Sequence, residues 1–175
     1  FSHEQGTIIR EEYTMKEREF IIRGVTHDVN VAKVAVLGVP DRPGVAHTIF
    51  SALADKAIDV DMIVQSIRNA DKNINDIVFT ISKSDVDQAK ALVEAVVKDM
   101  GALGVIVEED VAKVSVVGAG MYGSPGIAAT MFGALGDAGV NIEVISTSEI
   151  SISCLIKESQ VKEAVNAIHK RFFKD

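Results

Sequence analysis

The chain repeats itself, and this internal duplication constrains its fold more than any other feature of the sequence. Residues 43–66 and 125–148 are identical at ten of 24 aligned positions, and each segment opens with Pro-Gly. Upstream, Ala32–Val36 aligns with Ala112–Val116, so the second strand-to-helix loop is two residues longer than the first. A solenoid becomes stable only with three or more stacked units. Two copies therefore predict a duplicated domain.

Hydrophobic periodicity gives each copy the same order of elements. In the first copy, β-branched apolar runs and strict alternation predict strands, and apolar residues at helical spacing predict helices. The predicted elements are strands at residues 34–39, 60–64, 77–81 and 105–107, a helix after Pro43-Gly44, and a helix capped by Ser84 or Asp85. The order β-α-β-β-α-β is that of a ferredoxin-like α+β domain.

The second copy lacks a fourth strand after its last helix. Its predicted elements are strands at 113–117, 141–146 and 150–156 and helices at 127–138 and 161–168. A strand-like segment, Phe20–Val25, lies unused before the first copy. We expect this N-terminal strand to complete the second sheet, because an uncovered edge beside so apolar a strand invites aggregation. The first domain, residues 31–110, is then inserted within the second, residues 20–30 plus 111–175.

One motif suggests an alternative function, the binding of a dinucleotide. Gly118–Gly123 reads G-x-G-x-x-G between a predicted strand and a predicted helix, a pattern that can place a pyrophosphate on a helix N-terminus. The helix begins only after Ser124-Pro125-Gly126, and the candidate ribose-binding acid, Glu143, falls inside a strand. The corresponding loop of the first copy, residues 38–44, lacks the pattern. These departures disfavour a dinucleotide site.

Both Pro-Gly loops place a helix N-terminus after a strand. One interpretation is structural, with proline at the first helical position. The other is functional, with two helix N-termini that bind a small anion such as a carboxylate. Polar residues at Asp59–Asp61 and Asn141–Glu143 open the next predicted strand of each copy, either as solvated strand ends or as partners of a ligand ammonium. Gln65 and Thr147 occupy equivalent places later on that strand.

Composition argues against several classes of function. The chain has 18 Lys+Arg and 25 Asp+Glu, a net charge of −7, which argues against binding nucleic acid through its phosphates. No apolar run approaches the roughly 18 residues of a membrane span, and the four histidines lack metal-ligand spacing. The single cysteine, Cys154, lies on an apolar strand face and suits a reducing cytoplasm. The hydrophobic content of 47% predicts that surplus apolar surface forms a protein interface.

These features together resemble a known family. The duplicated β-α-β-β-α-β units with a D-x-P-G loop look like a tandem pair of ACT domains, and more specifically like the regulatory region of aspartate kinase. The segments that carry the resemblance are Val36–Gly44, Val117–Met121 and Asn141–Ile150. The resemblance covers nearly the whole chain, and residues 1–19 look like the end of the family's catalytic domain and its linker. Because residues precede Met15, near which the family's separate β subunits begin, we expect a fragment of the full-length enzyme.

The resemblance implies feedback regulation by threonine, by lysine or by both together. In the family, the strand-to-helix loop and the start of the second strand hold the carboxylate and ammonium of the amino acid. The implied effector-binding residues are Asp41, Arg42, Pro43, Gly44, Val45, Ala46 and Gln65 of the first copy, and Met121, Ser124, Asn141, Ile142 and Glu143 of the second. We expect threonine near Asp41 and Gln65, and lysine at the equivalent 121–124 loop.

The resemblance also implies partners. ACT domains pair side by side, so we expect a homodimer in which the first domain of one chain meets the second domain of the other. No catalytic residue and no cofactor is expected in this chain, since the family's ATP and Mg²⁺ belong to the catalytic domain on which it acts. The expected function is an amino-acid-binding regulatory region that shifts the equilibrium of that domain in the cytoplasm. A small dinucleotide-binding domain and a scaffold that only dimerises are the alternatives.

Overall fold

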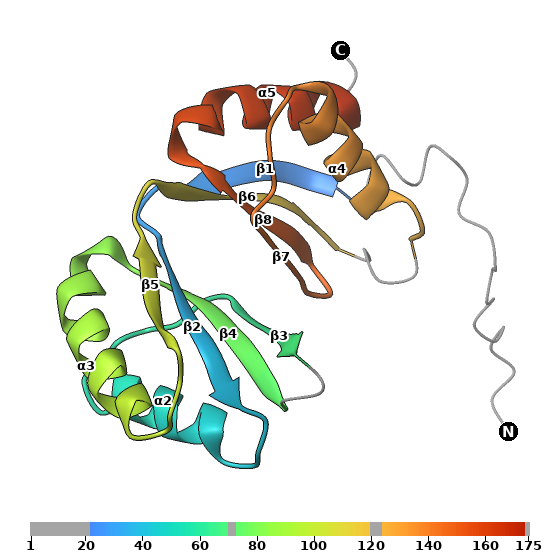
Figure 1. The fold of residues 1–175 in the computed structure, drawn as a ribbon. Helices are drawn as coiled ribbons and strands as arrows, with labels where there is room; N and C mark the ends of the chain where they lie inside the picture. The colour runs from blue at the N-terminus through green and yellow to red at the C-terminus, as the bar shows by residue number, and fades with distance from the viewer. Residues whose placement is uncertain (1–21, 70–72, 120–123, 174–175) are drawn as a thin grey trace, which may run out of the picture.

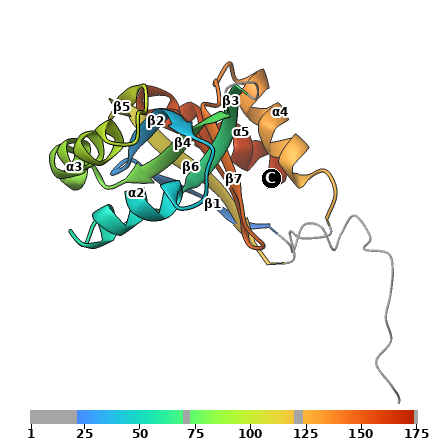
Figure 2. The ribbon, with the colours of Figure 1, turned by 60° about the horizontal axis from the view of Figure 1, so that its bottom comes forward.

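Two four-stranded antiparallel sheets organise the fold. The computed structural model describes residues 22–69, 73–119 and 124–173. The elements are, in chain order, β1 (Ile22–Asp28), β2 (Ala32–Pro40), α2 (Val45–Ala54), β3 (Ile63–Asn69), β4 (Ile74–Ile81), η2 (Lys83–Asp85), α3 (Val86–Lys98), β5 (Gly104–Glu108), β6 (Val111–Gly118), α4 (Ile127–Asp137), β7 (Val144–Thr147), β8 (Ser151–Lys157), η3 (Glu158–Gln160) and α5 (Val161–Phe172). Figures 1 and 2 show the strands between two pairs of helices, α2 with α3 and α4 with α5.

The two sheets have the same topology, with one strand supplied from a distance. Their orders are β3-β4-β2-β5 and β1-β6-β8-β7, so β1 takes the edge that β5 takes in the first sheet. β1 pairs antiparallel with β6, with Val25 opposite Val116. The expected fold, two ferredoxin-like α+β units with an N-terminal strand completing the second sheet, is confirmed. Phe20 and Ile21 lie outside the described residues, and the domain boundaries stay a prediction.

Each sheet buries one face against its own helices. In the first unit, Val34 and Phe79 on the sheet pack with Leu53 of α2, and all three are fully buried. In the second, Val114 and Cys154 pack in the same cluster as Leu135 and Ile168. Each sheet has one buried face because alternation along a strand places its apolar residues on one side, and helical spacing does the same along a helix. The opposite face of each sheet is left for other contacts.

A third, smaller apolar cluster joins the two units. Val31 and Met62 of the first unit are buried with Val111 and Leu155 of the second, and half-buried Val144 packs against them. Val31 and Val111 precede or begin equivalent strands, since Ala32 pairs with Ile81 and Ala112 pairs with Ile156. The two copies therefore meet through equivalent positions, around an approximate internal two-fold axis.

Two local predictions were wrong, and a third was right in position only. Gly44 is the N-cap of α2 and Val45 its first residue, so Pro43 precedes the cap instead of occupying the first helical position. The predicted cap of α3 forms no side-chain hydrogen bond, although Asp85 is at the N-cap position. The strands after the helices begin at Ile63 and Val144, so Asp59–Asp61 and Asn141–Glu143 are approach segments and not strand starts.

Candidate functional site

The N-termini of α2 and α4 are built alike. Gly44 and Gly126 are their N-caps, with φ of 93° and 96°, a left-handed conformation that glycine adopts without strain. Neither helix has a side-chain cap. The first helical bond of α2 runs from the N–H of Thr48 to the carbonyl of Gly44, so the preceding N–H groups lack intrahelical acceptors. These groups, with the positive end of the helix dipole, suit a carboxylate.

A hollow opens at each of these helix starts. The first has a volume of about 350 Å³ and is lined by Arg42–Val45, by His47 and Thr48 of α2, and by Met100. The second, of about 200 Å³, is lined by Pro125–Ile127, by Thr130 of α4, and by Ile22, Arg171 and Phe172. Of the predicted effector residues in this lining, Arg42, Pro43 and Gly44 are exposed and Val45 is buried. Asp41 and Ala46 are exposed next to them in the chain. Duplication has therefore preserved the hollow as well as the helix.

The predicted effector residues do not all come together within one chain. Asp41 follows the last residue of β2, whereas Glu143 contacts Lys33 near the first. At roughly 3.3 Å per residue, Lys33 and Asp41 lie about 25 Å apart along this strand. Gln65 lies exposed on β3, opposite Ile77 of β4. The loop at Asp41 and the segment that contains Glu143 can thus share one ligand only if they belong to different chains.

The remaining predicted residues fall in the second unit. Asn141 is exposed, and Ile142 and Glu143 are half-buried in the segment before β7. Ile142 and Glu143 also line a hollow of about 430 Å³ between β7 and the β3–β4 hairpin, whose wall includes Val64 and Val78. Ser124 is half-buried before α4, and Met121 lies outside the described residues.

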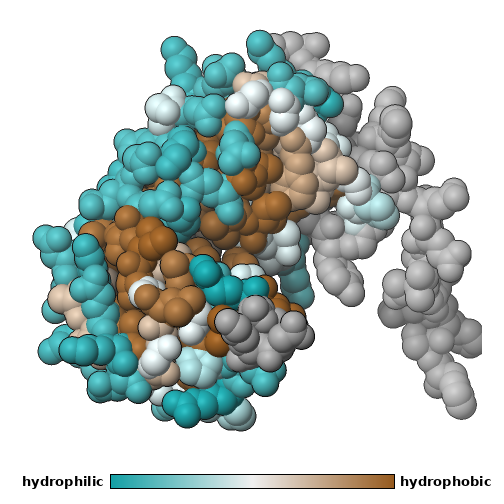
Figure 3. Space-filling model, viewed as in Figure 1, coloured by the Kyte–Doolittle hydropathy of each residue, from teal (hydrophilic) through white to brown (hydrophobic). Residues whose placement is uncertain are grey.

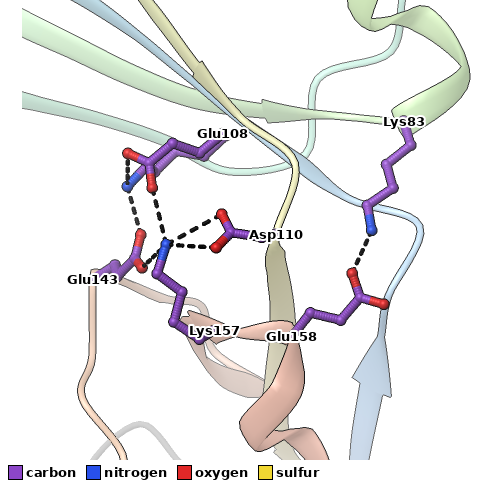
Figure 4. Close-up of polar contacts among 7 residues, drawn as sticks. Lys83, Glu108, Asp110, Glu143, Lys157 and Glu158 are labelled. Atoms are coloured by element: carbon purple, nitrogen blue, oxygen red, sulfur yellow. Dashed lines mark hydrogen bonds and ion pairs between the residues drawn. The ribbon is translucent and has the colours of Figure 1, made fainter.

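A ring of charged side chains surrounds Glu143. One carboxylate oxygen, Oε2, lies 2.5 Å from Lys33 Nζ, and Oε1 lies 3.2 Å from Lys157 Nζ. Glu108 closes the ring, at 2.8 Å from Lys33 and 3.3 Å from Lys157, and Asp110 adds a contact of 3.1 Å to Lys157. Figure 4 shows Glu108, Asp110 and Glu143 converging on the Lys157 ammonium. Both oxygens of Glu143 are thus engaged by lysines of its own chain.

Contacts within this cluster shift the pKa values of Lys33, Glu108, Asp110 and Lys157 toward the charged forms. The hydrogen bond from Lys33 lowers the pKa of Glu108, and the hydrogen bond from Lys157 lowers the pKa of Asp110. Burial disfavours the charged form of Lys33, but its hydrogen bonds to Glu108 and Glu143 outweigh burial and raise the pKa of Lys33. The pKa of Lys157 is raised chiefly by its hydrogen bond to Asp110. These four side chains are therefore charged near neutral pH.

Comparison with known proteins covers both copies. The family model described as the ACT domain matches residues 34–96 and 114–172. The crystal structure of the regulatory subunit of aspartate kinase from Thermus thermophilus, in its ligand-free form, is 37% identical. It superposes with a TM-score of 0.81 over 87% of this chain and 99% of that one.

The chain belongs to the ACT domain family.

Aspartokinases are the relatives that match it along its length. The aspartokinase of Mycolicibacterium smegmatis is 39% identical over 175 residues, and that of Corynebacterium efficiens is 41% identical over the same length. Each match covers 98% of this chain and 41% of the relative, so the chain spans less than half of these aspartokinases. A crystal structure of aspartokinase alpha and beta subunits contains a chain that is 40% identical, with a TM-score of 0.79 over 86% of this chain and 98% of that one.

The ACT architecture bears on the dinucleotide alternative. The Rossmann fingerprint works at the carboxyl edge of a parallel sheet, but β6 runs antiparallel to both of its neighbours, β1 and β8. The helix after the motif begins at Ile127, and residues 120–123 of the motif lie outside the described residues. The geometry therefore does not support a dinucleotide site at Gly118–Gly123.

Other groups in the described part of the ACT pair have structural roles. Cys154 is buried as expected, and burial raises the pKa of its thiol to about 12, so it is a core residue. Among residues 22–69, 73–119 and 124–173, no group of His, Cys, Asp and Glu side chains is arranged to hold a metal ion. In the same part of the chain, no helix is both long and apolar enough to cross a membrane.

Sequence reasoning missed the partners of Glu143. Lys33, Glu108 and Lys157 are separated along the chain, and no local periodicity connects them. The repeat alignment carried one usable signal, because Lys33 and Lys113 are matched lysines, each the only charged residue of its strand. A charge retained at the same place in both ACT domains requires an acidic partner if it is half-buried.

Proposed function

We propose that this chain is the regulatory region of an aspartate kinase and that it binds threonine or lysine as a feedback inhibitor. The likeness to aspartate kinase regulatory subunits along both copies supports the enzyme class. The observation that carries the site is the pair of helix N-termini, each with a glycine N-cap, no side-chain cap and an adjoining hollow. Such a site supplies N–H donors for the carboxylate of an α-amino acid.

The threonine site is proposed at the first of these helix starts. The N–H groups of Gly44, Val45 and Ala46 bind the carboxylate, and the Asp41 carboxylate accepts from the ammonium. Gln65 reaches the side chain of the effector, where a hydroxyl is a better partner than a methyl. Asn141 and Ile142 close the site from a second copy of the chain. Lysine is assigned to the equivalent loop that includes Ser124.

A homodimer supplies that second copy. β3 and β7 are edge strands of their sheets, and exposed isoleucines line them, with Ile63 52%, Ile67 75% and Ile145 43% accessible. Exposed edges and apolar side chains together favour pairing with another chain. Figure 3 shows further apolar surface on the first domain, over β2 and β5, where Ile106 is exposed. Pairing β3 of one chain with β7 of the other joins first and second domains.

Calorimetric titration of the 175-residue protein with threonine and with lysine tests the proposal, with the oligomer measured by light scattering. We expect a dimer whose threonine affinity falls roughly tenfold or more in Asp41→Ala, because removing a charged partner costs about 1.5–3 kcal/mol. Asp55→Ala, an exposed change at the far end of the same helix, is the matched control. Unchanged threonine affinity in both Asp41→Ala and Gln65→Ala means that the site is elsewhere.

A further inference from the structure

Two of the ion pairs between the domains are reciprocal. Lys33 and Lys113 occupy equivalent positions on β2 and β6. Asp61 and Glu143 are equivalent as well. The N–H of Asp61 donates to the carbonyl of Thr80 on β4, and the N–H of Glu143 donates to the carbonyl of Leu155 at the matching place on β8. Lys33 pairs with Glu143, and Lys113 pairs with Asp61. The lysine of each domain therefore holds the acid that precedes the second strand of the other domain.

The surroundings of the two pairs differ. Next to the Lys33–Glu143 pair, Lys157 bonds to Asp110. In the first domain, Asn30 is equivalent to Asp110 and Ser82 is equivalent to Lys157. There a neutral hydrogen bond joins Asn30 Nδ2 to Ser82 Oγ at 3.0 Å. Serine thus replaces the second lysine of the ring. One reciprocal contact is a closed ring of four charges, and the other is a lysine–aspartate pair.

The two ion pairs also differ in how far their side chains are exposed to solvent. The side chains of Lys33 and Glu143 are each 13% exposed, whereas Lys113 and Asp61 are 23% and 58% exposed. Ion pairs shielded from water are screened less by solvent and salt than exposed pairs, which contribute little. Breaking a shielded pair also leaves a charge without its partner. The ring therefore holds its segment more firmly than the second pair holds Asp59–Asp61.

The ring acts on the segment that the proposed function places against the effector. Glu143 ends Asn141–Glu143, its N–H bonds to Leu155, and both carboxylate oxygens contact lysines on β2 and β8. We propose that Lys33 and Lys157 are positioning residues that hold Asn141–Glu143 for effector binding and couple its position to the relative orientation of the two sheets. This inference rests on the effector site proposed above.

Coupling of this kind is reciprocal. If effector binding moves Asn141–Glu143, the ring passes the movement to β2 of the first domain, and a fixed orientation of the two sheets in turn favours the bound position of the segment. The orientation of the sheets is a quantity that an attached catalytic domain can sense. Loss of the Lys33 ammonium should therefore weaken effector binding and widen the range of domain orientations together.

The test measures both consequences on the full chain. Titration calorimetry with threonine compares Lys33→Met with Lys113→Met, its matched control in the second pair. Nitroxide labels on cysteines at the exposed positions Asp87 and Glu163, which lie on helices of different domains, report the distance distribution between the domains. We expect Lys33→Met to weaken threonine binding at least fivefold and broaden the distribution, and Lys113→Met to change affinity less than twofold. Lys33→Arg, which keeps the charge, should restore both properties.

A double variant separates positioning from general destabilisation. Because Lys33 and Glu143 share a contact within one ring, Lys33→Met/Glu143→Gln should weaken threonine binding by less than the sum of the two single variants. If Lys33→Met fails to fold by circular dichroism, Glu143→Gln and Lys33→Arg carry the comparison. Wild-type affinity and an unchanged distance distribution in both Lys33→Met and Glu143→Gln would overturn the inference. If the unaltered chain binds neither threonine nor lysine, the proposed function fails, and the distance distribution alone then decides whether the ring sets domain orientation.

Discussion

The two ACT domains share their buried faces and differ on the faces turned away from their helices. Across the second sheet, Thr26, Ser115, Ser153 and Ser146 stand in one row, since each lies opposite the next in register. The equivalent row of the first sheet is Ile106, Ala35, Val78 and Val64. One row is made of hydroxyls and the other is wholly apolar.

The two copies are alike at core positions and differ at positions on the outer faces of their sheets. The helix-facing positions must fill a closed core, so Val34 and Val114, or Leu53 and Leu135, have stayed alike and fully buried. The opposite faces contact other surfaces, and there the two copies have diverged. Domains with equal cores and unequal outer faces suit unequal partners, as the proposed pairing of first with second domains requires.

The largest effect is expected from removing β1, the strand that completes the second sheet from a distant part of the chain. A truncation that starts at Val31 deletes β1, bares the edge of β6 and removes buried Ile22, whereas the first domain keeps all four of its strands. We expect the second domain to unfold or aggregate while the first remains folded. Hydrogen exchange by mass spectrometry should show lost protection in β6 and β8 with protection retained in β2 and β4. Equal protection in both sheets would contradict the assigned topology.

A matched pair of core substitutions comes next. Leu53→Ala and Leu135→Ala delete equivalent, fully buried side chains from α2 and α4. Each should lower the free energy of unfolding of its own domain by about 2–5 kcal/mol through lost burial and a cavity. Urea unfolding gives the size of the effect, and hydrogen exchange shows which domain responds. A change that spreads equally over both domains would indicate a single cooperative unit.

The hydroxyl row offers a smaller effect. Ser115 Oγ and Ser153 Oγ are 2.7 Å apart, and Ser115 is only 5% exposed. Ser153→Val should cost about 1–3 kcal/mol, because it leaves a buried hydroxyl without this partner. Ser115→Val/Ser153→Val makes this part of the row apolar, as in the first domain, and should recover much of that loss. Urea unfolding of the three proteins distinguishes them, and a double variant less stable than Ser153→Val would contradict the argument.

The smallest effect is that of pH on the charged ring. The pKa of Glu108 is lowered from its ordinary value of 4.5, chiefly by its hydrogen bond with Lys33. A carboxyl with a lowered pKa stabilises the fold fully above its ordinary pKa and loses that contribution as pH falls through the lowered value. Stability should therefore fall below about pH 4.5, and fall less in Lys33→Met, which has already lost the pair. Urea midpoints measured between pH 7 and pH 3 check the difference.

Local periodicity predicted most of the fold and little of the ring. Alternation identified β4 and β8, the repeat alignment identified β6, and the unused apolar segment before the first copy identified β1. The start of α2 after Pro43-Gly44 was predicted correctly, but Gly44 in a left-handed conformation is the N-cap, so Pro43 is not the first helical residue. The ring depends on contacts between residues 33, 108, 143 and 157, which only the packing of two domains brings together.

In the candidate site, too, local features were predictable from the sequence and contacts between the domains were not. The D-x-P-G loop and its helix start were legible from residue type alone, because proline, glycine and an uncapped helix have local consequences. The interpretation of Glu143 as a ligand for an ammonium did not take account of Lys33 and Lys157, which engage both of its oxygens. In the proposed site, Asn141 and Ile142 remain the groups of that segment that are available to an effector.

A mixed dimer shows whether two chains share each effector site. One chain carries Asp41→Ala and the other Asn141→Ala, and the heterodimer is isolated through two different affinity tags. Its two sites then contain both substitutions or neither. Titration with threonine should show half the wild-type number of sites at wild-type affinity, although each homodimeric variant binds weakly. A heterodimer that binds threonine as weakly as the two homodimers would show that the residues act within one chain and would contradict the account.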